Sequence, residues 1–431
     1  MIELRVIGED PEVDGSIKGM PPGHPAVALS QLGKKEWSIT AGDLPFPVAV
    51  LKQSAIATNR EWMRQFLTES GALIAPHGKT TMSPQLFAMQ LDDGAWGLTA
   101  ATANQIAVYR KFGINRILMA NQLVGRANIA FIANELVRDE NFEFYTLVDS
   151  VAAAEMLANG AQAAGLERGF NVLIEIGARG ARTGVRSVEE GLTLAKSLQR
   201  LAPHVRLCGV ECYEGVFPTA TPAERVQLSA KLFANMMMLA DAIEVENLFA
   251  PGDILITAGG TEFFDLAART MARSTNRRRT CIIRSGCYLT HDDLAYEHAF
   301  QRMLQRTPEL ERITPRLQPA LEVWTCVQSR PEPNLALLTA GKRDVSFDFD
   351  LPMAKWWSSG GAQPERLGKD YECFRLNDQH IFLRIPDDSQ LSVGDYVGLG
   401  VSHVCTTFDK WSLIYLVDDE YDVTGAIRTY F

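Results

Sequence analysis

The chain has 431 residues, of which 46% are hydrophobic and 22% are charged, and its formal net charge at pH 7 is −10. This composition is typical of a globular protein with one large domain and a smaller one, and the diffuse negative charge disfavours a nucleic-acid partner. No run approaches the roughly 18 apolar residues of a membrane span, and the N-terminal region carries acids and prolines in place of a secretion signal. The seven cysteines are scattered and form no CxxC pair, so we expect reduced thiols and a cytoplasmic protein.

The N-terminal segment, residues 1–52, is expected to pack with a β-rich domain at the other end of the chain. Trp37–Ile39 and Val48–Leu51 are short apolar runs of the kind that form strands. Gln53–Glu69 has helical spacing and leads into the next domain. We assign no chemistry to the N-terminal segment.

Residues 53–305 alternate short apolar runs with segments of helical periodicity. The runs are continuously hydrophobic, which indicates strands buried on both faces and therefore a parallel sheet covered by helices. Eight such units predict a closed (β/α)8 TIM barrel, whereas a doubly wound open sheet usually has a GxGxxG turn, which we do not find. The eight runs are Ala72–Ala75, Gly97–Ala101, Arg116–Ala120, Phe142–Val148, Asn171–Ile176, Val205–Cys212, Ile254–Ala258 and Cys281–Arg284.

Residues 306–431 have recurring prolines, short apolar runs and turn signals such as Gly394-Asp395. This pattern predicts a compact antiparallel β domain, with which the N-terminal strands could pair. The expected strands include Leu321–Val327, Leu335–Leu338, Cys373–Leu376, His380–Ile385 and Tyr396–Gly398.

Lys79 comes shortly after the first predicted barrel strand, at the end where parallel α/β folds build their active sites. An amine in that place can form a Schiff base with an aldehyde cofactor. Pro76 and Gly78 constrain the backbone before it, and a lysine near a helix N-terminus opposes the macrodipole, which favours the neutral, nucleophilic amine. A solvated surface lysine is the alternative for this residue taken alone.

Two later loops could hold an anion. Gly259-Gly260-Thr261 follows the seventh strand and would expose backbone N–H groups and a hydroxyl at the start of a helix. Gly286 and Tyr288 follow the eighth strand, and barrels usually hold phosphate at these two loops. A plain tight turn is the alternative, but a lysine together with a phosphate cup predicts pyridoxal phosphate.

Arg182 and Tyr213 are candidates for contacts with the ring of this cofactor. Arg182 lies in a glycine-rich loop after the fifth strand and would project into the barrel mouth, where it could hold the phenolic oxygen. Tyr213 ends the sixth strand and could face the pyridine ring. A solvated arginine and a core tyrosine are the alternatives.

His403 and Cys405 form a His-x-Cys motif in the predicted β domain. If the segment is extended, the spacing puts the imidazole and the thiol on one face, where both could bind zinc. Two protein ligands are fewer than usual, and packed strand residues are the alternative. Open coordination positions would suit a catalytic site, because a substrate can then enter the metal shell.

Together these motifs resemble the alanine-racemase-type (fold type III) pyridoxal phosphate enzymes, and within them the zinc-dependent D-serine dehydratase and D-threonine aldolase group. The resemblance runs from about Pro47 to the C-terminus, and it implies a homodimer and Lys79 as Schiff-base residue and general base. His-x-Cys is typical of the dehydratases and His-x-Asp of the aldolases. Thr81 departs from the second histidine usual in the group. The residues that carry the resemblance are Pro76-His77-x-Lys79-Thr80, Ala181–Val185, Gly259-Gly260-Thr261 and His403-x-Cys405.

The resemblance implies an enzyme that eliminates water from D-serine or another 3-hydroxy-D-amino acid, giving a 2-oxo acid and ammonia with the help of pyridoxal phosphate and zinc. A D-threonine aldolase or a 3-hydroxy-D-aspartate lyase would share nearly all of this machinery. A metal-free amino-acid racemase would have no use for His403 and Cys405. A non-catalytic pyridoxal phosphate-binding protein remains a further alternative, although such proteins resemble the barrel alone.

Overall fold

The computed structural model describes residues 10–217, 220–272 and 278–431. The chain forms two compact units, which are described separately below. The barrel unit comprises Gln65–Lys79 and Gly94–Gly286, and the β-rich unit comprises Met1–Arg64, Thr80–Asp93 and Cys287–Phe431. In the described ranges, no helix combines the length and the hydropathy needed to cross a bilayer.

The barrel unit contains an eight-stranded, all-parallel sheet in the order β4-β11-β10-β9-β8-β7-β6-β5. The two ends of this order are joined by a parallel bridge between His77 and Thr99, and the Thr99 N–H donates to the Pro76 carbonyl at 2.9 Å. The predicted closed (β/α)8 barrel is confirmed, and each predicted run overlaps a strand. The strands are β4 (Leu73–Ile74), β5 (Leu98–Ala100), β6 (Arg116–Gln122), β7 (Glu143–Val148), β8 (Phe170–Glu175), β9 (Val205–Glu211), β10 (Ile254–Ala258) and β11 (Arg279–Ile283).

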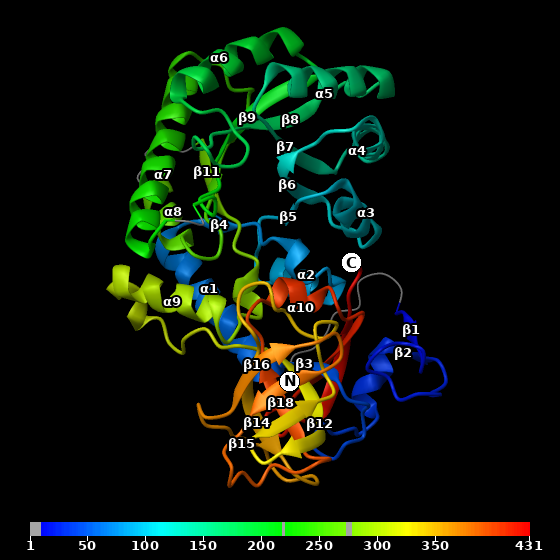
Figure 1. Cartoon of the computed structure of the whole chain (residues 1–431). Helices are drawn as coiled ribbons and strands as arrows, with labels where there is room; N and C mark the ends of the chain where they lie inside the picture. The colour runs from blue at the N-terminus through cyan, green and yellow to red at the C-terminus, as the bar shows by residue number, and fades with distance from the viewer. Residues whose placement is uncertain (1–9, 218–219, 273–277) are drawn as a thin grey trace. The chain divides into compact units, whose positions relative to one another are not determined.

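Helices surround this sheet, as Figure 1 shows. Several begin where the sequence offers a capping side chain: Thr102, Ser150 and Ser187 each accept a hydrogen bond from the N–H three residues on. Thr221 and Glu224 form a reciprocal capping box at the start of the longest of these helices. The helices are α3 (Ala103–Lys111), α4 (Arg126–Arg138), α5 (Val151–Ala164), α6 (Val188–Leu198), α7 (Pro222–Val245) and α8 (Phe264–Met271).

The barrel interior is filled by aliphatic side chains from strands around the whole sheet. Each fully buried leucine or isoleucine contributes about 1.5–3 kcal/mol relative to an exposed one. A packed interior leaves no room for chemistry there, so polar functional groups have to lie at the strand ends. The cluster consists of Ala75, Leu118, Leu147, Leu173, Leu255 and Ile282.

The β-rich unit contains a ten-stranded sheet with the main order β15-β14-β18-β12-β13-β17-β16. Strand β3 (Val48–Lys52) pairs antiparallel with β12 and parallel with β19, so the predicted joining of an N-terminal strand to the C-terminal sheet is confirmed. The other strands are β12 (Leu321–Glu332), β13 (Leu335–Leu338), β14 (Met353–Ser358), β15 (Glu365–Arg366), β16 (Glu372–Leu376), β17 (Ile381–Arg384), β18 (Tyr396–Gly400), β19 (Leu413–Val417) and β20 (Val423–Arg428).

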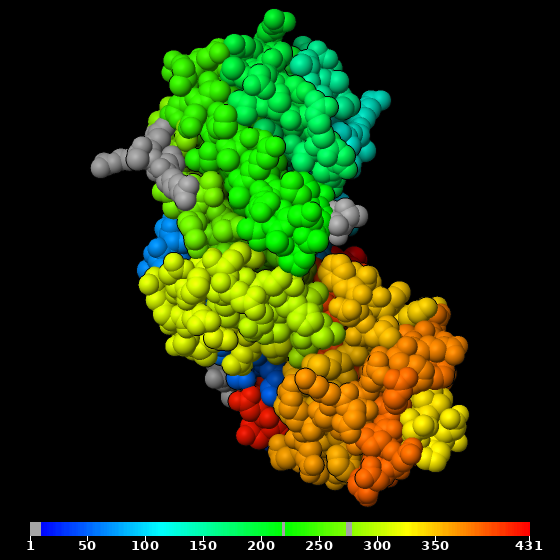
Figure 2. Space-filling view, turned by 60° about the vertical axis from the view of Figure 1, so that its left-hand side comes forward, coloured from blue at the N-terminus to red at the C-terminus, as the bar shows by residue number. Residues whose placement is uncertain are grey.

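The N-terminal residues 10–46 are part of the core of this unit. Leu32 and Ile39 pack in one cluster with Trp324 and Tyr415 of the sheet. The predicted strand at Trp37–Ile39 is wrong: only Ser38 forms an isolated bridge, and Ile39 is fully buried instead. The small hairpin β1 (Glu12–Val13) and β2 (Val27–Ala28) and the 3-10 turn η1 (Leu29–Lys34) complete the segment. In the space-filling view, the orange residues of the β-rich unit form one continuous area (Figure 2).

The helices of the β-rich unit explain which segments of the chain belong to it. The predicted helix at Gln53–Glu69 is confirmed as α1 (Gln53–Ser70), and its first half is tied to later segments. The Asn59 amide donates to the Leu289 carbonyl at 3.0 Å, and Trp62 packs edge-on against Phe300. Because of these contacts, the residues from Cys287 onward belong to the β-rich unit. This unit therefore begins earlier in the chain than the change in sequence composition indicates. The further helices are α2 (Pro84–Asp92), α9 (Ala295–Arg306) and α10 (Val404–Phe408), with 3-10 turns η2 (Gly78–Thr80), η4 (Cys287–Leu289) and η5 (Pro308–Arg312).

Candidate active site

Lys79 lies in a 3-10 turn that follows β4, and its side chain is exposed. His77, two residues earlier, has a buried Nδ1 with no hydrogen-bond partner among the described residues. Burial, and then the charges of Lys79, Arg284 and Arg182, hold the pKa of His77 well below its ordinary value. His77 is therefore neutral, and the cations of three loops lie within electrostatic range of one ring.

The Gly259-Gly260 loop after β10 is held by a buried glutamate. The Glu214 carboxylate accepts from the Gly260 N–H at 2.6 Å and from the Gly259 N–H at 3.3 Å. Gly259 has φ +86°, a conformation that side chains other than glycine rarely adopt. Burial raises the pKa of Glu214, although these N–H groups oppose the shift. The two N–H groups predicted to meet a phosphate are therefore already paired with a carboxylate, and Thr261 follows in a partly exposed turn.

Arg284, at the end of β11, is buried and makes three contacts with neighbouring strand ends. It donates to Glu211 Oε1 at 2.5 Å, to Thr257 Oγ1 at 2.8 Å and to the Cys212 carbonyl at 3.1 Å. Burial raises the pKa of Glu211 to about 8 in spite of the opposing Arg284 charge. The next residue, Ser285, is 1% exposed, and its Oγ has no partner in the described part of the chain. An unpaired hydroxyl at this strand end can donate to an added anion.

Arg182 and Tyr213 are brought together, because the Arg182 guanidinium lies 4.7 Å from the Tyr213 ring centroid. The loop that carries Arg182 folds back on β8: the Glu175 carboxylate accepts from Thr183 Oγ1 at 2.9 Å and the Gly177 N–H donates to the Val185 carbonyl at 2.9 Å. A Cβ on Gly260 would lie 3.0 Å from Tyr213 Cε2. Tyr213 therefore lies between the arginine loop and the double-glycine loop.

Gly286 and Tyr288 belong to different compact units. A Cβ on Gly286 would lie 2.5 Å from the His77 carbonyl oxygen, so the loop after β11 touches the backbone that leads to Lys79. Tyr288 is buried in the β-rich unit, and its pKa is raised by burial while a hydrogen bond with Gln90 opposes the shift. Within the barrel unit, Gly286 therefore lies close to the loop that leads to Lys79. Within the β-rich unit, Tyr288 contacts α2.

The His-x-Cys motif does not lie on a strand. His403 is extended at the N-cap of α10, and Cys405 is in the first turn of that short helix, so the expected i, i+2 strand arrangement is wrong. The chain leaves β18 at Gly400 and enters a helix because Thr407 bonds back to the His403 carbonyl through its N–H and its hydroxyl. His403 Nδ1 lies 2.6 Å from Asp348 Oδ2.

The Cys405 thiol contacts two other polar groups of the β-rich unit. Its Sγ lies 3.6 Å from Cys287 Sγ and 3.6 Å from Thr80 Oγ1, and Thr80 is the residue that follows Lys79 in the sequence. None of the described cysteines is in a disulfide. Among the described residues, no group of three or more His, Cys, Asp or Glu side chains converges as a metal site.

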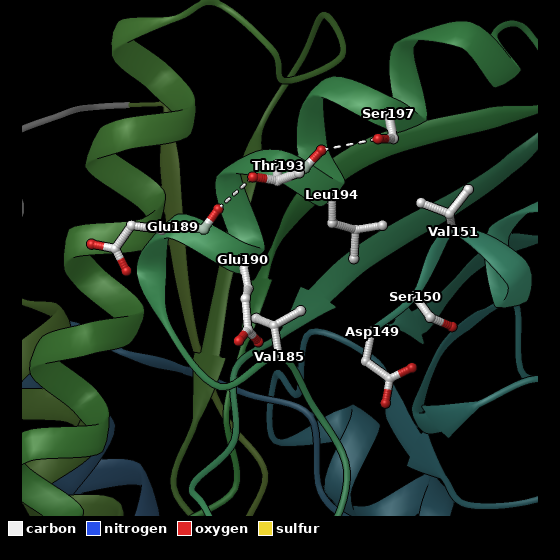
Figure 3. Close-up of a pocket in the computed structure, with 9 residues that line it drawn as sticks. All are labelled: Asp149, Ser150, Val151, Val185, Glu189, Glu190, Thr193, Leu194 and Ser197. Carbon is white, nitrogen blue, oxygen red and sulfur yellow. Dashed lines mark hydrogen bonds between the residues drawn. The ribbon is translucent and has the colours of Figure 1, made fainter.

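A pocket of about 430 Å³ lies elsewhere in the barrel unit, between the start of α5 and one face of α6 (Figure 3). Figure 3 shows Thr193 bonded to the Glu189 carbonyl, with Ser197 bonded to Thr193 in turn. None of the predicted site residues lines this pocket. Its lining consists of Asp149, Ser150, Val151, Val185, Glu189, Glu190, Thr193, Leu194 and Ser197.

Several polar residues at these sites were not predicted from the sequence. Glu211 is the last residue of β9 and Glu214 follows three residues later, and acids at the carboxyl end of a buried strand are a usable signal. Asp348 lies 55 residues before its partner His403, and nothing in its sequence surroundings points to that contact. Cys287 was within the predicted loop after β11, but its approach to Cys405 depends on the tertiary fold.

Comparison with known proteins supports the fold and the family resemblance. Residues 320–417 match the putative serine dehydratase domain family. The chain is 29% identical over 252 residues to the D-threo-3-hydroxyaspartate dehydratase of Delftia sp. (strain HT23), covering 58% of this chain and 62% of that enzyme, less than two thirds of its length. It is 23% identical over 378 residues to a D-threonine aldolase from Arthrobacter sp., covering 86% of this chain and 89% of that enzyme.

Solved structures show the same architecture. The D-threonine aldolase of Filomicrobium marinum superposes with a TM-score of 0.74 at 21% identity, covering 90% of this chain and 95% of that one. An alanine racemase from Clostridium difficile superposes with a TM-score of 0.59 at 16% identity, covering 89% and 98%. Another solved structure is that of a D-threo-3-hydroxyaspartate dehydratase with one cysteine replaced by alanine, in a metal-free form. The chain therefore has the alanine-racemase-like fold and resembles the dehydratases and aldolases that act on 3-hydroxy-D-amino acids.

Proposed function

We propose that this chain is a pyridoxal phosphate- and zinc-dependent lyase that eliminates water from a 3-hydroxy-D-amino acid, as D-serine dehydratases do. The products would be a 2-oxo acid and ammonia. Both named relatives act, by their names, on amino acids of the D series with a 3-hydroxyl group, namely D-threo-3-hydroxyaspartate and D-threonine. This shared substrate chemistry supports the choice of substrate class.

One observation carries the proposal. The thiol of Cys405 lies 3.6 Å from the hydroxyl of Thr80, the residue next to Lys79 in the chain. The His-x-Cys motif therefore contacts the residue that follows the expected Schiff-base lysine in the chain. A racemase would have no use for this motif, whereas a dehydratase also needs a group that assists the departing hydroxyl.

The residues of the barrel mouth fit pyridoxal phosphate. Lys79 offers an exposed amine, and the Ser285 hydroxyl and His77 Nδ1 are buried polar atoms without a partner in the described ranges. Arg182 and Tyr213 form a cation–aromatic pair that could flank a flat ring. Because Glu214 already engages Gly259 and Gly260, we assign the phosphate chiefly to the Ser285-Gly286 side, with Thr261 at the rim.

The chemistry can be assigned to individual side chains. When bound, the cofactor supplies an electron sink for the carbanion at Cα. Lys79 would hold the cofactor covalently and, once released by the incoming amino acid, would take the Cα proton with its Nζ. Arg182 would hold the ring oxygen. Glu214 fixes the double-glycine loop on which the Tyr213 ring packs.

His403 and Cys405 would hold the metal through an imidazole nitrogen and a thiolate, ligands that zinc prefers. A zinc ion in that place supplies Lewis acidity, which makes the β-hydroxyl a better leaving group. With two protein ligands, positions remain for the substrate hydroxyl and carboxylate.

A D-threonine-type aldolase is the second candidate, because the aldolase relative aligns with 86% of this chain. An aldolase would cleave the Cα–Cβ bond and release an aldehyde and glycine, using the same lysine and metal. The product therefore separates the two activities. A 3-hydroxy-D-aspartate lyase would be identified by its substrate.

The test uses the full chain loaded with pyridoxal phosphate and Zn²⁺. D-serine, D-threonine and D-threo-3-hydroxyaspartate are offered in turn, and 2-oxo acid, ammonia, aldehyde and glycine are measured. We expect Cys405→Ala to abolish 2-oxo acid release while the visible cofactor absorbance stays. Cys326→Ala, which changes a partly buried thiol on β12, is the matched control and should remain active. Racemisation of an amino acid that persists with a chelator, without any 2-oxo acid, would overturn the proposal.

A further inference from the structure

A short segment is hydrogen-bonded to the part of the chain that carries the His-x-Cys motif. In this segment, which we call the strap (Ser346–Asp350), main-chain and side-chain groups bond to Ser402–Thr407. The His403 N–H donates to Ser346 Oγ at 3.0 Å, and the Ser346 N–H contacts Thr407 Oγ1 at 3.1 Å. The Ser402 hydroxyl donates to the Asp350 carbonyl at 2.5 Å. The backbone on both sides of His403 is therefore fixed within the β-rich unit.

Asp348, in the middle of the strap, bonds to two side chains of the motif segment. Its Oδ2 lies 2.6 Å from His403 Nδ1, and its Oδ1 accepts from Thr406 Oγ1 at 2.7 Å. An ionised carboxylate can only accept, so the proton of a neutral imidazole is held on Nδ1. The lone pair of that ring is then on Nε2, the nitrogen left for a metal.

The His403 ring is also held by aromatic contacts. Phe349 of the strap stacks on it, with ring centroids 4.5 Å apart and an interplanar angle of 19°. Tyr296 meets it edge-on at 5.9 Å and 83°. Phe349 covers one face of the imidazole, Tyr296 packs against the same ring, and Nδ1 is hydrogen-bonded. Rotation of the imidazole is therefore restricted.

We propose that Asp348 is a positioning residue for the metal of the proposed lyase: it fixes the Nδ1–H tautomer and the orientation of His403, so that Nε2 is the ligand. The inference rests on the proposed function only in assuming a metal at His403 and Cys405. Carboxylates that accept the second N–H of a ligand histidine raise its basicity, and their loss typically costs 10–100-fold in metal affinity.

Exposure makes this role testable without unfolding the protein. The Asp348 side chain is 41% exposed and that of His403 is 14% exposed. A hydrogen bond with one partner this exposed contributes little to folding. A change in metal affinity after replacement of Asp348 can then be attributed to the ring and not to a loss of fold.

The experiment measures Zn²⁺ affinity of the full cofactor-loaded chain by competition with a chromophoric chelator. We expect Asp348→Ala to weaken Zn²⁺ binding about 10–100-fold. Asp348→Asn should retain part of the affinity, because an amide oxygen can still accept from Nδ1. Asp350→Ala is the matched control, since its contact with Ser402 uses the main-chain oxygen, and it should bind Zn²⁺ as the unmodified protein does. Unchanged affinity in Asp348→Ala would overturn the inference.

A second measurement needs no Asp348 variant. In the zinc-free protein labelled with ¹⁵N-histidine, long-range proton–nitrogen spectra report the tautomer of each imidazole, and His403→Gln assigns the signal among the seven histidines. We expect His403 to be protonated on Nδ1 in its neutral form. A neutral ring protonated on Nε2 would contradict the positioning role.

The failure of this inference and that of the proposed function are distinguishable. If His403→Ala and Cys405→Ala both bind Zn²⁺ as tightly as the unmodified chain, the metal site itself is wrong and both ideas fall. If these two variants lose Zn²⁺ but Asp348→Ala does not, only the role of Asp348 is wrong. Neither reading depends on turnover of any substrate.

Discussion

At the barrel mouth, Lys79 is an exposed amine two residues after a partly buried, neutral histidine. We predict that borohydride reduction of the cofactor-loaded protein attaches pyridoxal phosphate to Lys79 alone, as mapped by peptide mass spectrometry. Lys79→Ala should lose the tag and lower kcat by about 10²–10⁴-fold or more, because one group acts as anchor and as base. Lys111→Ala, an exposed lysine on α3, should be tagged and active as before. A tag on another lysine would contradict this assignment.

Asp292 is a fully buried carboxyl group with one oxygen lacking a partner among the described residues. Its Oδ1 accepts from the Leu294 and Tyr296 N–H groups at the start of α9. Burial, above all, raises the pKa of Asp292 to about 8. A raised carboxyl pKa means that the folded state binds the proton more tightly, so the contribution of Asp292 to stability falls as pH rises from about 4 to about 8.

Asp292→Asn keeps the capping oxygen and removes the charge. We predict little change in the free energy of unfolding near pH 4 and a gain of about 1–3 kcal/mol at pH 8. Urea unfolding of both proteins across this range measures the difference. The same difference at every pH would mean that Asp292 does not titrate in the folded protein as proposed.

The residues that sequence could predict were those next to a strand end. Lys79, Arg182 and Gly259 all follow apolar runs, so their place at one end of the barrel followed from the parallel topology. Glu214 occupies the N–H groups of Gly259 and Gly260, and this could not be predicted because a carboxylate and a phosphate are equally good acceptors for that loop. The Asp348–His403 contact joins residues 55 apart and has no local signal.

At the scale of elements, the loops after β4 and β11 touch through backbone atoms. A Cβ on Gly286 would lie 2.5 Å from the His77 oxygen and 2.9 Å from the His77 nitrogen, and neither atom can move without displacing the bridge to β5. We predict that Gly286→Ala lowers the free energy of unfolding by about 1–3 kcal/mol and weakens retention of pyridoxal phosphate, which equilibrium dialysis measures.

Gly368→Ala is the control for this substitution. Its Cβ would meet only the flexible Asp370 side chain, so stability and cofactor retention should stay the same. If Gly286→Ala behaves like Gly368→Ala, then the two loops are not held together as tightly as the geometry indicates.

The barrel strands were easier to predict than those of the β-rich unit, for a physical reason. A strand covered on both faces is continuously apolar, and each of the eight runs is of this kind. Strand β14 is interrupted by the polar residues Lys355 and Ser358, so it gave no such run. His403 and Cys405 were placed on a strand because their segment follows apolar β18, whereas side-chain bonds from Thr407 turn it into a helix.

At the scale of the whole molecule, the division into units depends on contacts between distant segments. Arg60 on α1 makes a paired ion bridge with Asp93 at the end of α2, which joins two stretches separated by the first barrel strand. The composition of the sequence changes near residue 310, which predicts the boundary between the barrel and the β domain there. A local pattern cannot reveal that α2 and the residues after Cys287 pack with the sheet of the β-rich unit.

The core of the β-rich unit contains a buried ion cluster that links three elements. Lys355 on β14 lies 2.9 Å from Glu322 on β12 and 3.0 Å from Asp293. Burial opposes the charge on Lys355, but the two carboxylates prevail and raise its pKa to about 12. Burial alone would raise the pKa of Glu322, yet Lys355 and the Trp356 N–H outweigh it, so that pKa is lowered. Glu322 therefore stabilises the fold above its unfolded pKa, and this contribution is lost as pH falls through the folded value.

Lys355→Met removes the only cation of this cluster among the described residues and leaves two buried carboxylates facing each other. We predict a loss of about 3–5 kcal/mol in the free energy of unfolding at pH 7, measured by urea titration. The loss should shrink toward pH 5, because with the cation gone the carboxyl pKa values rise and protonation relieves the repulsion. Lys342→Met, at an exposed position of the same unit, should change stability by less than about 0.5 kcal/mol. A deficit in Lys355→Met that does not vary with pH would show that lost packing, and not the unpaired carboxylates, is what destabilises this half of the molecule.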